Sequence, residues 1–229
     1  MIPLDHPTAT RPHRVYAALT NHCNRACPWC STYSSPRGST WLALEAFEAA
    51  LPEGLFEVQL EGGEPTMHPQ FWEFVERARS NPRCSRLVLC TNGVVMPRDA
   101  RLKGWIEELG APLTVKLSIN HYLLEHDKGL MQLAAMTRDA IRDLGGDRLL
   151  ILNVRLRPGR DEWVRAAVSD AGLLQHANVF DLQRYGLASG ETEWDSPFLA
   201  GQNFRMVNPD GEVFGPDLLS RSEAMGKLP

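Results

Sequence analysis

Three cysteines lie within one short stretch of the chain, Cys23-Asn-Arg-Ala-Cys27-Pro-Trp-Cys30. Thiols at this spacing are typical ligands of a metal ion or an iron–sulfur cluster. A structural zinc site usually has four protein ligands, commonly in two separated pairs, and no second cysteine pair follows here. His22 is the nearby candidate for a fourth ligand, but its backbone adjoins Cys23, which makes ligation by all four side chains awkward. Three thiolates instead suit a 4Fe–4S cluster in which one iron stays open.

A second motif, Glu61-Gly62-Gly63-Glu64-Pro65-Thr66, follows an apolar run that we expect to be a strand. Glycines let backbone polar groups approach a small ligand closely, and they permit positive φ angles. Taken alone, the motif is equally explained by a plain turn between a strand and a helix.

Together, the cysteine triplet and the glycine motif resemble the radical S-adenosylmethionine (radical SAM) superfamily. Its signature has this cysteine spacing with an aromatic residue before the last cysteine, here Trp29. The resemblance covers the chain from residue 15 to about residue 186. It implies one 4Fe–4S cluster on Cys23, Cys27 and Cys30, with S-adenosylmethionine on the open iron. The other positions that match its cofactor-binding signatures here are Trp29, Gly62, Gly63, Glu64 and Pro65.

Weaker agreement comes from the ends of later strands. Thr91-Asn92-Gly93 and Ser118-Ile119-Asn120 are similar to signatures of the superfamily, which makes Thr91 and Ser118 cofactor-binding candidates by resemblance. The alternative is a hydroxyl that satisfies backbone groups at a strand end. Asn153 and Arg155 share one face of a strand by the two-residue period, and an inward guanidinium needs an anionic partner. Arg155 is therefore a candidate for holding the methionine carboxylate or a substrate anion.

These motifs need a scaffold that brings several strand ends together. Apolar β-branched runs alternate with helical patterns, which predicts parallel βαβ units and an α/β fold. A full eight-unit barrel typically needs ~250 residues, so we expect a partial (β/α)6 TIM barrel with the ligand at the carboxyl ends of its strands. The expected strands are Arg14–Leu19, Leu55–Glu61, Arg86–Thr91, Leu113–Ile119, Leu149–Leu156 and Asn178–Arg184. The expected helices are Trp41–Leu51, Pro69–Ser80, Arg98–Leu109, Asp127–Leu144 and Gly159–Gly172, with Pro69 in a first turn.

The pattern divides the chain into an N-terminal extension (1–13), the partial barrel (14–186), and a C-terminal loop and β-hairpin (187–229). Asp210-Gly211 between short apolar runs is a hairpin signal, and we expect the hairpin to lie as a lid over the open side of the barrel. This segment resembles the hairpin that opens the twitch or SPASM-type auxiliary-cluster domain of related enzymes, where a cysteine follows. No cysteine occurs beyond Cys90, so we expect a single cluster per chain.

The two remaining cysteines have ordinary interpretations. If Thr91 faces the barrel interior, alternation places Leu89 inward and Cys90 outward under the helices. Cys84 is expected to be a loop thiol.

Polar residues at the ends of the later strands are the substrate candidates: Asn120, His121, Tyr122, Gln183, Arg184 and Tyr185. They suit a small hydrophilic metabolite. Residues 1–13 leave no room for a leader-binding domain before the first strand, which favours a metabolite over a peptide.

Composition limits the partners. The formal net charge is -4 and no basic run is dense enough to follow a phosphate backbone, so nucleic acid is not expected. No apolar stretch suits a signal peptide or a membrane span, which predicts a cytoplasmic protein. The resemblance also implies an electron donor such as flavodoxin or ferredoxin, since these clusters have low potentials.

The expected activity is therefore reductive cleavage of S-adenosylmethionine to a 5′-deoxyadenosyl radical, which abstracts hydrogen from a small polar metabolite in natural-product or cofactor biosynthesis. Modification of a ribosomal peptide is the alternative within the superfamily. A non-catalytic iron–sulfur or zinc module is the alternative of another class, and the glycine motif argues against it.

Overall fold

The computed structural model of the protein describes residues 13–182, 186–187, 204–215, 218, 221–226 and 228. The substrate candidates Gln183, Arg184 and Tyr185 lie outside these described residues.

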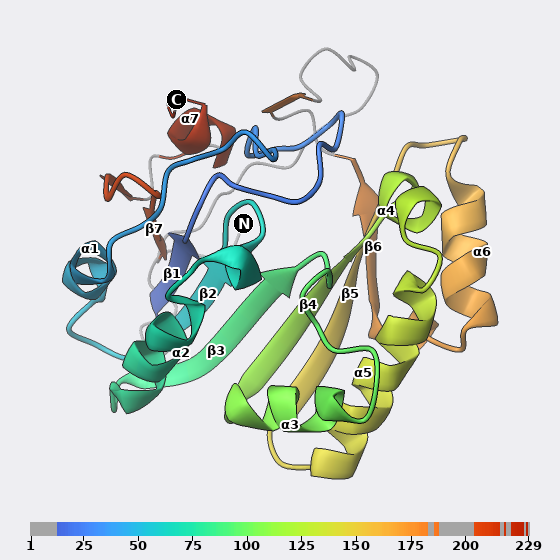
Figure 1. The fold of residues 1–229 in the computed structure, drawn as a ribbon, viewed down its shortest axis with the longest axis horizontal. Coiled ribbons are helices and arrows are strands. Elements are labelled where there is room, and N and C mark those ends of the chain that lie inside the picture. The colour runs from blue at the N-terminus through green and yellow to red at the C-terminus, as the bar shows by residue number, and fades with distance from the viewer. Residues whose placement is uncertain are drawn as a thin grey trace, which may run out of the picture.

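One eight-stranded sheet organises the described residues, in the order β6-β5-β4-β3-β2-β1-β7-β8 (Figure 1). Its strands are β1 His13–Ala18, β2 Phe56–Glu61, β3 Cys84–Thr91, β4 Leu113–Ile119, β5 Arg148–Leu156, β6 Ala177–Asp181, β7 Phe204–Val207 and β8 Val213–Phe214. Neighbours from β6 through to β7 pair in parallel, and β7 pairs with β8 antiparallel. The carboxyl ends of β1 to β6 therefore lie along one edge of the sheet.

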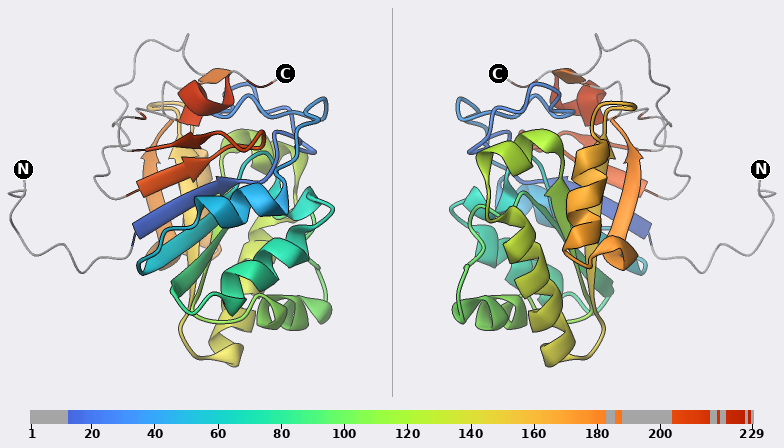
Figure 2. Two further views of the ribbon diagram at one scale, coloured as in Figure 1. Left: turned by 90° about the vertical axis from the view of Figure 1, so that its left-hand side faces the viewer. Right: turned by 90° about the vertical axis from the view of Figure 1, so that its right-hand side faces the viewer.

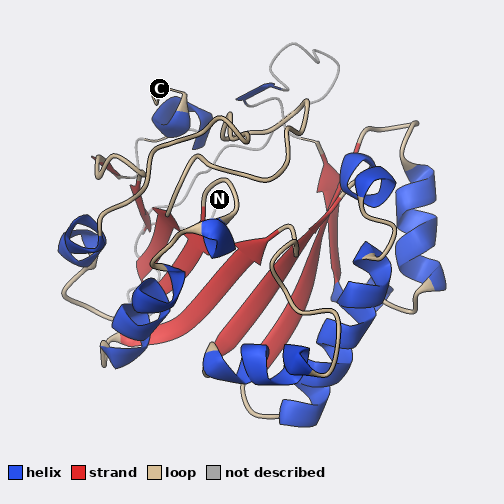
Figure 3. Cartoon of the chain, in the orientation of Figure 1, coloured by secondary structure: helices blue, strands red, loops and turns tan. Residues whose placement is uncertain are grey.

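Helices alternate with the first six strands, as the sequence pattern predicts for a partial barrel of (β/α)6 type. The α-helices are α1 Leu44–Ala50, α2 Phe71–Ser80, α3 Arg101–Glu108, α4 His121–His126, α5 Leu130–Leu144, α6 Glu162–Asp170 and α7 Arg221–Met225, and the short 3-10 helices are η2 Pro65–Met67 and η3 Leu174–His176. Helices α2, α3, α5 and α6 run along the outer side of the sheet (Figures 1 and 3). No helix in the described part of the chain is long and apolar enough to cross a membrane.

All five predicted helices begin two or three residues later than expected, and for two of them the structure shows the cause. Pro69 lies before α2, in a turn where the Gln70 N–H donates to the His68 ring at 3.1 Å, and the helix begins at Phe71. The predicted helix Asp127–Leu144 instead follows a separate helix, α4, that the sequence pattern did not reveal. The Asp127 carboxylate accepts the Gly129 N–H at 3.1 Å and so holds the break between α4 and α5.

The strands bury an apolar outer face against helices α1 to α6. Their other face carries polar side chains at β2, β4 and β5, but at β7 it is apolar, where Phe204 and Met206 pack with Met225 of α7. Side chains such as Leu89, Val115 and Leu117 are fully buried against the helices and form the main core. The alternate positions, which we call the inner face, point away from the helices.

Both cysteines of β3 depart from their predictions. Cys90 pairs in register with Lys116 of β4 and shares the inner face, so the prediction that it lies under the helices was wrong. The alternation itself holds, but its phase is reversed, with Leu89 and Thr91 on the helix side. Cys84 is the first residue of β3 and pairs with Phe56 of β2, because the strand begins two residues earlier than its apolar run.

The predicted hairpin exists and extends the sheet. Strand β7 pairs in parallel with β1, and β8 folds back on β7 through a turn in which Gly211 has φ 87°. Figure 2 shows the hairpin directly beside β1. Asn208, fully buried, donates its Nδ2 to the Ala224 carbonyl of α7 at 2.7 Å. The hairpin thus continues the edge of the partial barrel and carries α7 with it.

Candidate functional site

The cysteine loop, residues 22–35, leaves the carboxyl end of β1. The Cys23 N–H donates to the Ser35 carbonyl at 3.1 Å, which closes the loop at its base. A turn brings the Cys30 N–H to the Cys27 carbonyl at 3.1 Å. The loop therefore presents all three thiols over the edge where the barrel strands end.

Two of these thiols have strongly raised pKa values. Burial is the largest of the causes that together raise the pKa of Cys23 and of Cys27 to about 12. The Glu64 carboxylate and the other two thiols contribute to the rise for Cys23, and Cys30 contributes to it for Cys27. The guanidinium groups of Arg155 and Arg25 act in the opposite direction on the pKa of Cys27. A strongly cationic ligand is therefore needed to hold these thiols in their deprotonated form.

The glycine loop, residues 61–66, packs directly on the cysteine loop. The Gly63 N–H donates to the Thr20 carbonyl at 2.6 Å, and the Glu64 N–H donates to the His22 carbonyl at 2.9 Å. A Cβ on Gly63 would lie 2.0 Å from the His22 carbonyl oxygen, and Gly62 has φ +131°. The glycines are thus required for contact between the two loops, besides any contact with a ligand.

Glu64 joins this loop to the end of β3. Its fully buried carboxylate accepts the hydroxyls of Thr66 at 2.6 Å and Thr91 at 2.7 Å, and the backbone N–H groups of Thr66 at 3.3 Å and Asn92 at 2.7 Å. Burial raises the pKa of Glu64, and these four donors counteract the rise. The side chain is therefore a brace between loops, and it has no exposed group to offer to a ligand.

The inner face below these loops is polar and charged. Lys116 donates its Nζ to Gln59 Oε1 at 2.8 Å, and Gln59 Nε2 donates in turn to the buried Glu61 carboxylate. The predicted Ser118 and Asn153 are register partners on β4 and β5. Arg155 lies over the Phe180 ring of β6, 5.7 Å from its centroid.

A second cluster lies at the ends of β4 and β5. The His121 ring packs against Trp29 of the cysteine loop, with the ring centroids 4.1 Å apart and the planes tilted by 42°. Its Nδ1 donates to Asp161 at 3.0 Å, and Arg157 clamps the same carboxylate with Nε at 3.0 Å and Nη2 at 2.7 Å. The Arg157 guanidinium also lies 5.3 Å from the Trp29 ring centroid. Trp29 is therefore held between a histidine and an arginine that share one buried carboxylate.

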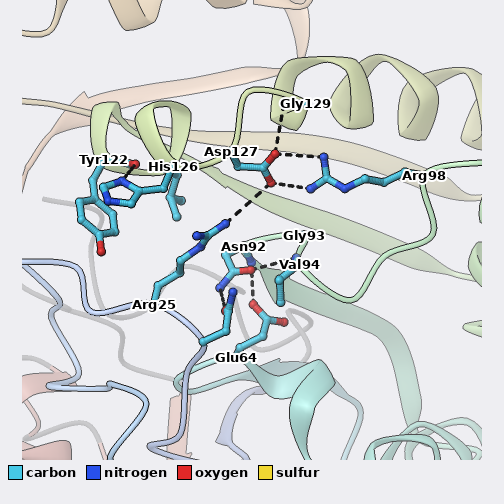
Figure 4. Close-up of polar contacts among 12 residues, drawn as sticks. Arg25, Glu64, Asn92, Gly93, Val94, Arg98, Tyr122, His126, Asp127 and Gly129 are labelled. Atoms are coloured by element: carbon cyan, nitrogen blue, oxygen red, sulfur yellow. Dashed lines mark hydrogen bonds and ion pairs between the residues drawn. The ribbon is translucent and has the colours of Figure 1, made fainter.

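Asp127 fixes the other side of the cysteine loop. Figure 4 shows its carboxylate between Arg98, which binds it through two nitrogens, and Arg25 of the cysteine loop at 4.0 Å.

The C-terminal region also contacts the cysteine loop. Ser222 of α7 donates its hydroxyl to the Ser31 carbonyl at 2.8 Å, and the Leu187 N–H donates to the Cys30 carbonyl at 3.0 Å. A Cβ on Gly186 would lie 2.3 Å from that same Cys30 oxygen. Segments far apart in sequence therefore enclose the loop.

Comparison with known proteins agrees with this geometry. The family model described as "Radical SAM superfamily" matches residues 18–144, which include the cysteine loop, the glycine loop and the ends of β3 and β4. The chain belongs to the radical SAM superfamily.

Curated relatives in the superfamily have different named activities. The chain is 26% identical to a GTP 3′,8-cyclase of Yersinia pestis over 180 residues, which is 72% of this chain and 53% of that protein. It is 31% identical to a PqqA peptide cyclase of Ruegeria pomeroyi over 94 residues, which is 38% of this chain and 24% of that protein. The chain thus spans about half or less of the length of these relatives.

Solved structures show the same fold. SuiB of Streptococcus suis bound to S-adenosylmethionine matches with a TM-score of 0.53 at 13% identity, over 89% of this chain and 60% of that one. SuiB bound to its precursor peptide SuiA matches with a TM-score of 0.56, over 82% and 42%. These likenesses confirm the partial-barrel fold of a radical SAM protein.

The superfamily uses a 4Fe–4S cluster and S-adenosylmethionine, and the residues present fit both. Cys23, Cys27 and Cys30 would supply three thiolates to a cluster of four irons, which takes one thiolate per iron. Among the described residues no three His, Cys, Asp or Glu side chains are grouped for a single metal ion. The glycine loop contacts the cysteine loop, and Arg155 of the inner face is near enough to Cys27 to lower its pKa, so these residues would hold S-adenosylmethionine.

The other predicted residues have mixed placements. Ser118, Asn153 and Arg155 share the inner face, whereas Thr91 is buried with its hydroxyl bound to Glu64.

The described substrate candidates lie around α4. Asn120 caps α4 by accepting the Leu123 N–H at 2.9 Å. Tyr122 stacks on His126 with the ring centroids 4.0 Å apart and meets Trp29 edge-on. Pro65 is buried at the start of η2, and His121 belongs to the Asp161 cluster.

Sequence reasoning missed several residues that shape the site. Asp161 and Asp127 are distant from every motif, and only the folded chain reveals their arginine partners. Asn92 was visible within Thr91-Asn92-Gly93, but its contact with Cys23 was not. The inner-face position of Lys116 follows from the period of β4 once Ser118 is placed inward.

Proposed function

We propose that the protein binds one 4Fe–4S cluster through Cys23, Cys27 and Cys30, reductively cleaves S-adenosylmethionine, and abstracts hydrogen from a small polar metabolite that carries an anionic group. When bound and reduced, the cluster supplies an electron that breaks the bond between sulfur and C5′ and yields the 5′-deoxyadenosyl radical. The family membership supports the chemistry, and the charged inner face supports the substrate class.

The single observation that carries the substrate proposal is the pair of cations on the inner face, of which Arg155 would meet the methionine carboxylate of the cofactor and Lys116 the anionic group of the substrate. Lys116 and Arg155 come from neighbouring strands and point away from the helices, toward the space that the barrel encloses. A cation in such a space binds a carboxylate or phosphate of a ligand, because pairing the two charges offsets the cost of removing each from water. Ser118 and Asn153 would add neutral hydrogen-bonding groups between them.

The cofactor roles follow from position. The backbone of the glycine loop and the Trp29 ring would contact S-adenosylmethionine beside the thiols, and Arg155, which is near enough to Cys27 to lower its pKa, would meet the methionine carboxylate. Asp161, through His121 and Arg157, would hold Trp29 in place. Enclosure by α7 and by residues 186–187 would keep water from the reacting atoms.

A peptide substrate is the second candidate. The PqqA peptide cyclase of Ruegeria pomeroyi and the SuiA-bound SuiB structure favour it, because both names refer to peptides. The likeness to GTP 3′,8-cyclase favours a small anionic metabolite. We also propose a low-potential flavodoxin or ferredoxin as electron donor and a single cluster per chain.

The test is anaerobic reconstitution with iron and sulfide, reduction with dithionite, and mass spectrometry of 5′-deoxyadenosine. We expect about four irons per chain and product formation. In Cys27→Ala both are expected to be lost, whereas Cys84→Ala, which alters a thiol outside the cysteine loop, should retain them. Cleavage that persists in Cys27→Ala would contradict the ligand assignment.

Substrate class is then tested with two libraries under the same assay, anionic metabolites and synthetic peptides. A true substrate is expected to raise 5′-deoxyadenosine formation, and deuterium from its reactive position should appear in that product. Lys116→Met should weaken the response to an anionic metabolite and leave uncoupled cleavage in place. A response to peptides alone would favour the second candidate.

A further inference from the structure

Asn92 makes a contact that the proposed function does not use. Its side-chain Nδ2 lies 3.6 Å from Cys23 Sγ and 2.9 Å from Asn24 Oδ1. Its backbone N–H donates to Glu64 Oε2 at 2.7 Å, and its side-chain Oδ1 accepts the Val94 N–H at 2.9 Å (Figure 4). The backbone N–H and both polar atoms of the side chain are thereby held in one geometry.

The orientation of the carboxamide is decided by chemistry. The Val94 N–H can only donate, so the atom of Asn92 that faces it must be the oxygen. The NH₂ group is consequently the one directed at Cys23 and Asn24. The Glu64 carboxylate, which is itself fully buried, fixes the backbone from which this side chain extends.

The sulfur of Cys23 has few other sources of stabilisation. Its residue is only 7% exposed, so water contributes little, and besides Asn92 it receives the backbone N–H of Arg25. The thiol also donates to Asn24 Oδ1 at 3.8 Å, a contact that disappears when the sulfur loses its proton to bind iron. Asn92 then remains as a side-chain donor to this ligand.

Hydrogen bonds to cluster sulfur atoms stabilise the more negative, reduced state and so raise the reduction potential. We propose that Asn92 is a positioning residue that tunes the cluster by donating its Nδ2–H to the Cys23 sulfur. This inference rests on the proposed function, because it takes Cys23 as a cluster ligand.

The test is a redox titration of the reconstituted protein, in which the electron paramagnetic resonance signal measures the amount of reduced cluster at each potential. In Asn92→Ala and Asn92→Asp the ratio of reduced to oxidised cluster at a fixed potential is expected to fall about tenfold, which is ~59 mV for one electron. Asn24→Ala removes the other acceptor of the same NH₂ group and should cause no such fall. Iron content and thermal unfolding are measured for each variant.

Two results would overturn the inference: an unchanged potential in both Asn92 variants, or an equal fall in Asn24→Ala, which would indicate a general disturbance of the loop. If the wild-type chain assembles no cluster, the proposed function fails instead, and iron analysis distinguishes the two failures.

A second measurement needs no variant. In wild-type protein labelled with ¹⁵N at asparagine, pulsed electron paramagnetic resonance of the reduced cluster without S-adenosylmethionine should detect a weak ¹⁵N coupling. Its absence would overturn the inference even if the Asn92 variants fail to fold.

Discussion

Glu64 shows how a single side chain organises this site. It lies in the motif that resembles a cofactor-binding loop, yet its carboxylate is fully buried and accepts four hydrogen bonds from residues of two loops. Each donor would otherwise be buried without a partner, which costs about 1–3 kcal/mol per group. The residue therefore contributes to the site by holding the glycine loop against the end of β3.

We predict that Glu64→Gln lowers the free energy of unfolding by about 1–3 kcal/mol, because an amide replaces one accepting oxygen with a donor that faces other donors. Urea denaturation of the apoprotein measures the effect. Glu73→Gln is the matched control: Glu73 is exposed on α2, contacts Gln70, and should change stability by less than about 0.5 kcal/mol. Equal midpoints for the two variants would show that Glu64 is no brace.

At the scale of residues, the groups that would bind the cluster and the cofactor were easier to predict from the sequence than the residues that hold them in place. The thiols and the glycines form short motifs, so their types and spacing alone predicted the superfamily. Asp161, Asp127 and the donor role of Asn92 depend on partners that are distant in sequence, and no local pattern encodes such pairs. The prediction for Cys90 was wrong for another reason. The two-residue period of β3 was correct, but it was assumed that Thr91 faces the barrel interior, whereas Thr91 faces the helices.

At the scale of elements, the loops after β1 and β2 behave as one unit. Their backbones are joined by hydrogen bonds from Gly63 and Glu64, and the glycine loop has no room for a side chain at Gly63. The order and type of the elements could be predicted, because the hydrophobic pattern changes from the period of a strand to the period of a helix within every βαβ unit. Helix starts were less predictable, because side chains such as His68 and Asp127 hold turns that compete with the first helical turn.

We predict that Gly63→Ala disrupts the cysteine loop, since its Cβ would lie 2.0 Å from a backbone oxygen that has no freedom to move without shifting His22. The variant should retain well under half of the wild-type iron after reconstitution and unfold at a lower urea concentration.

Gly104→Ala is the control, because Gly104 lies within α3 and a Cβ there would meet no atom within 4 Å. Alanine at this position should stabilise the protein by about 0.5–1 kcal/mol and leave iron content unchanged. Normal iron content in Gly63→Ala would refute the requirement for close loop packing.

At the scale of the whole molecule, two buried histidines couple stability to pH. His68 and His121 are each 5% exposed, and burial lowers the pKa of both below the ordinary value of 6.5. His68 accepts the Gln70 N–H on Nδ1 and lies 3.2 Å from the Leu42 carbonyl through Nε2, an arrangement that requires the neutral ring. In His121, Asp161 and Glu125 favour the charged ring and Arg157 opposes it, but burial is the largest influence.

The sign of the effect follows from proton linkage. Because the unfolded chain binds protons at these histidines at a higher pH than the folded chain does, unfolding takes up protons below about pH 6.5. The free energy of unfolding should therefore be highest above this pH and fall as the pH drops toward 5. Urea denaturation of the apoprotein at several pH values between 8 and 5 measures the slope.

In His68→Gln and His121→Gln one titrating ring is removed, so each variant should lose part of the slope between pH 7 and pH 5. The double variant should lose approximately the sum, since the two rings lie on different elements and share no hydrogen-bond partner. Above pH 7.5 the rings are neutral in both states, and the difference between wild type and each variant should be constant there. A slope that is unchanged in the double variant would assign the acid sensitivity to the carboxylates, of which Asp161 has a lowered pKa because the hydrogen bonds from Arg157 outweigh its burial.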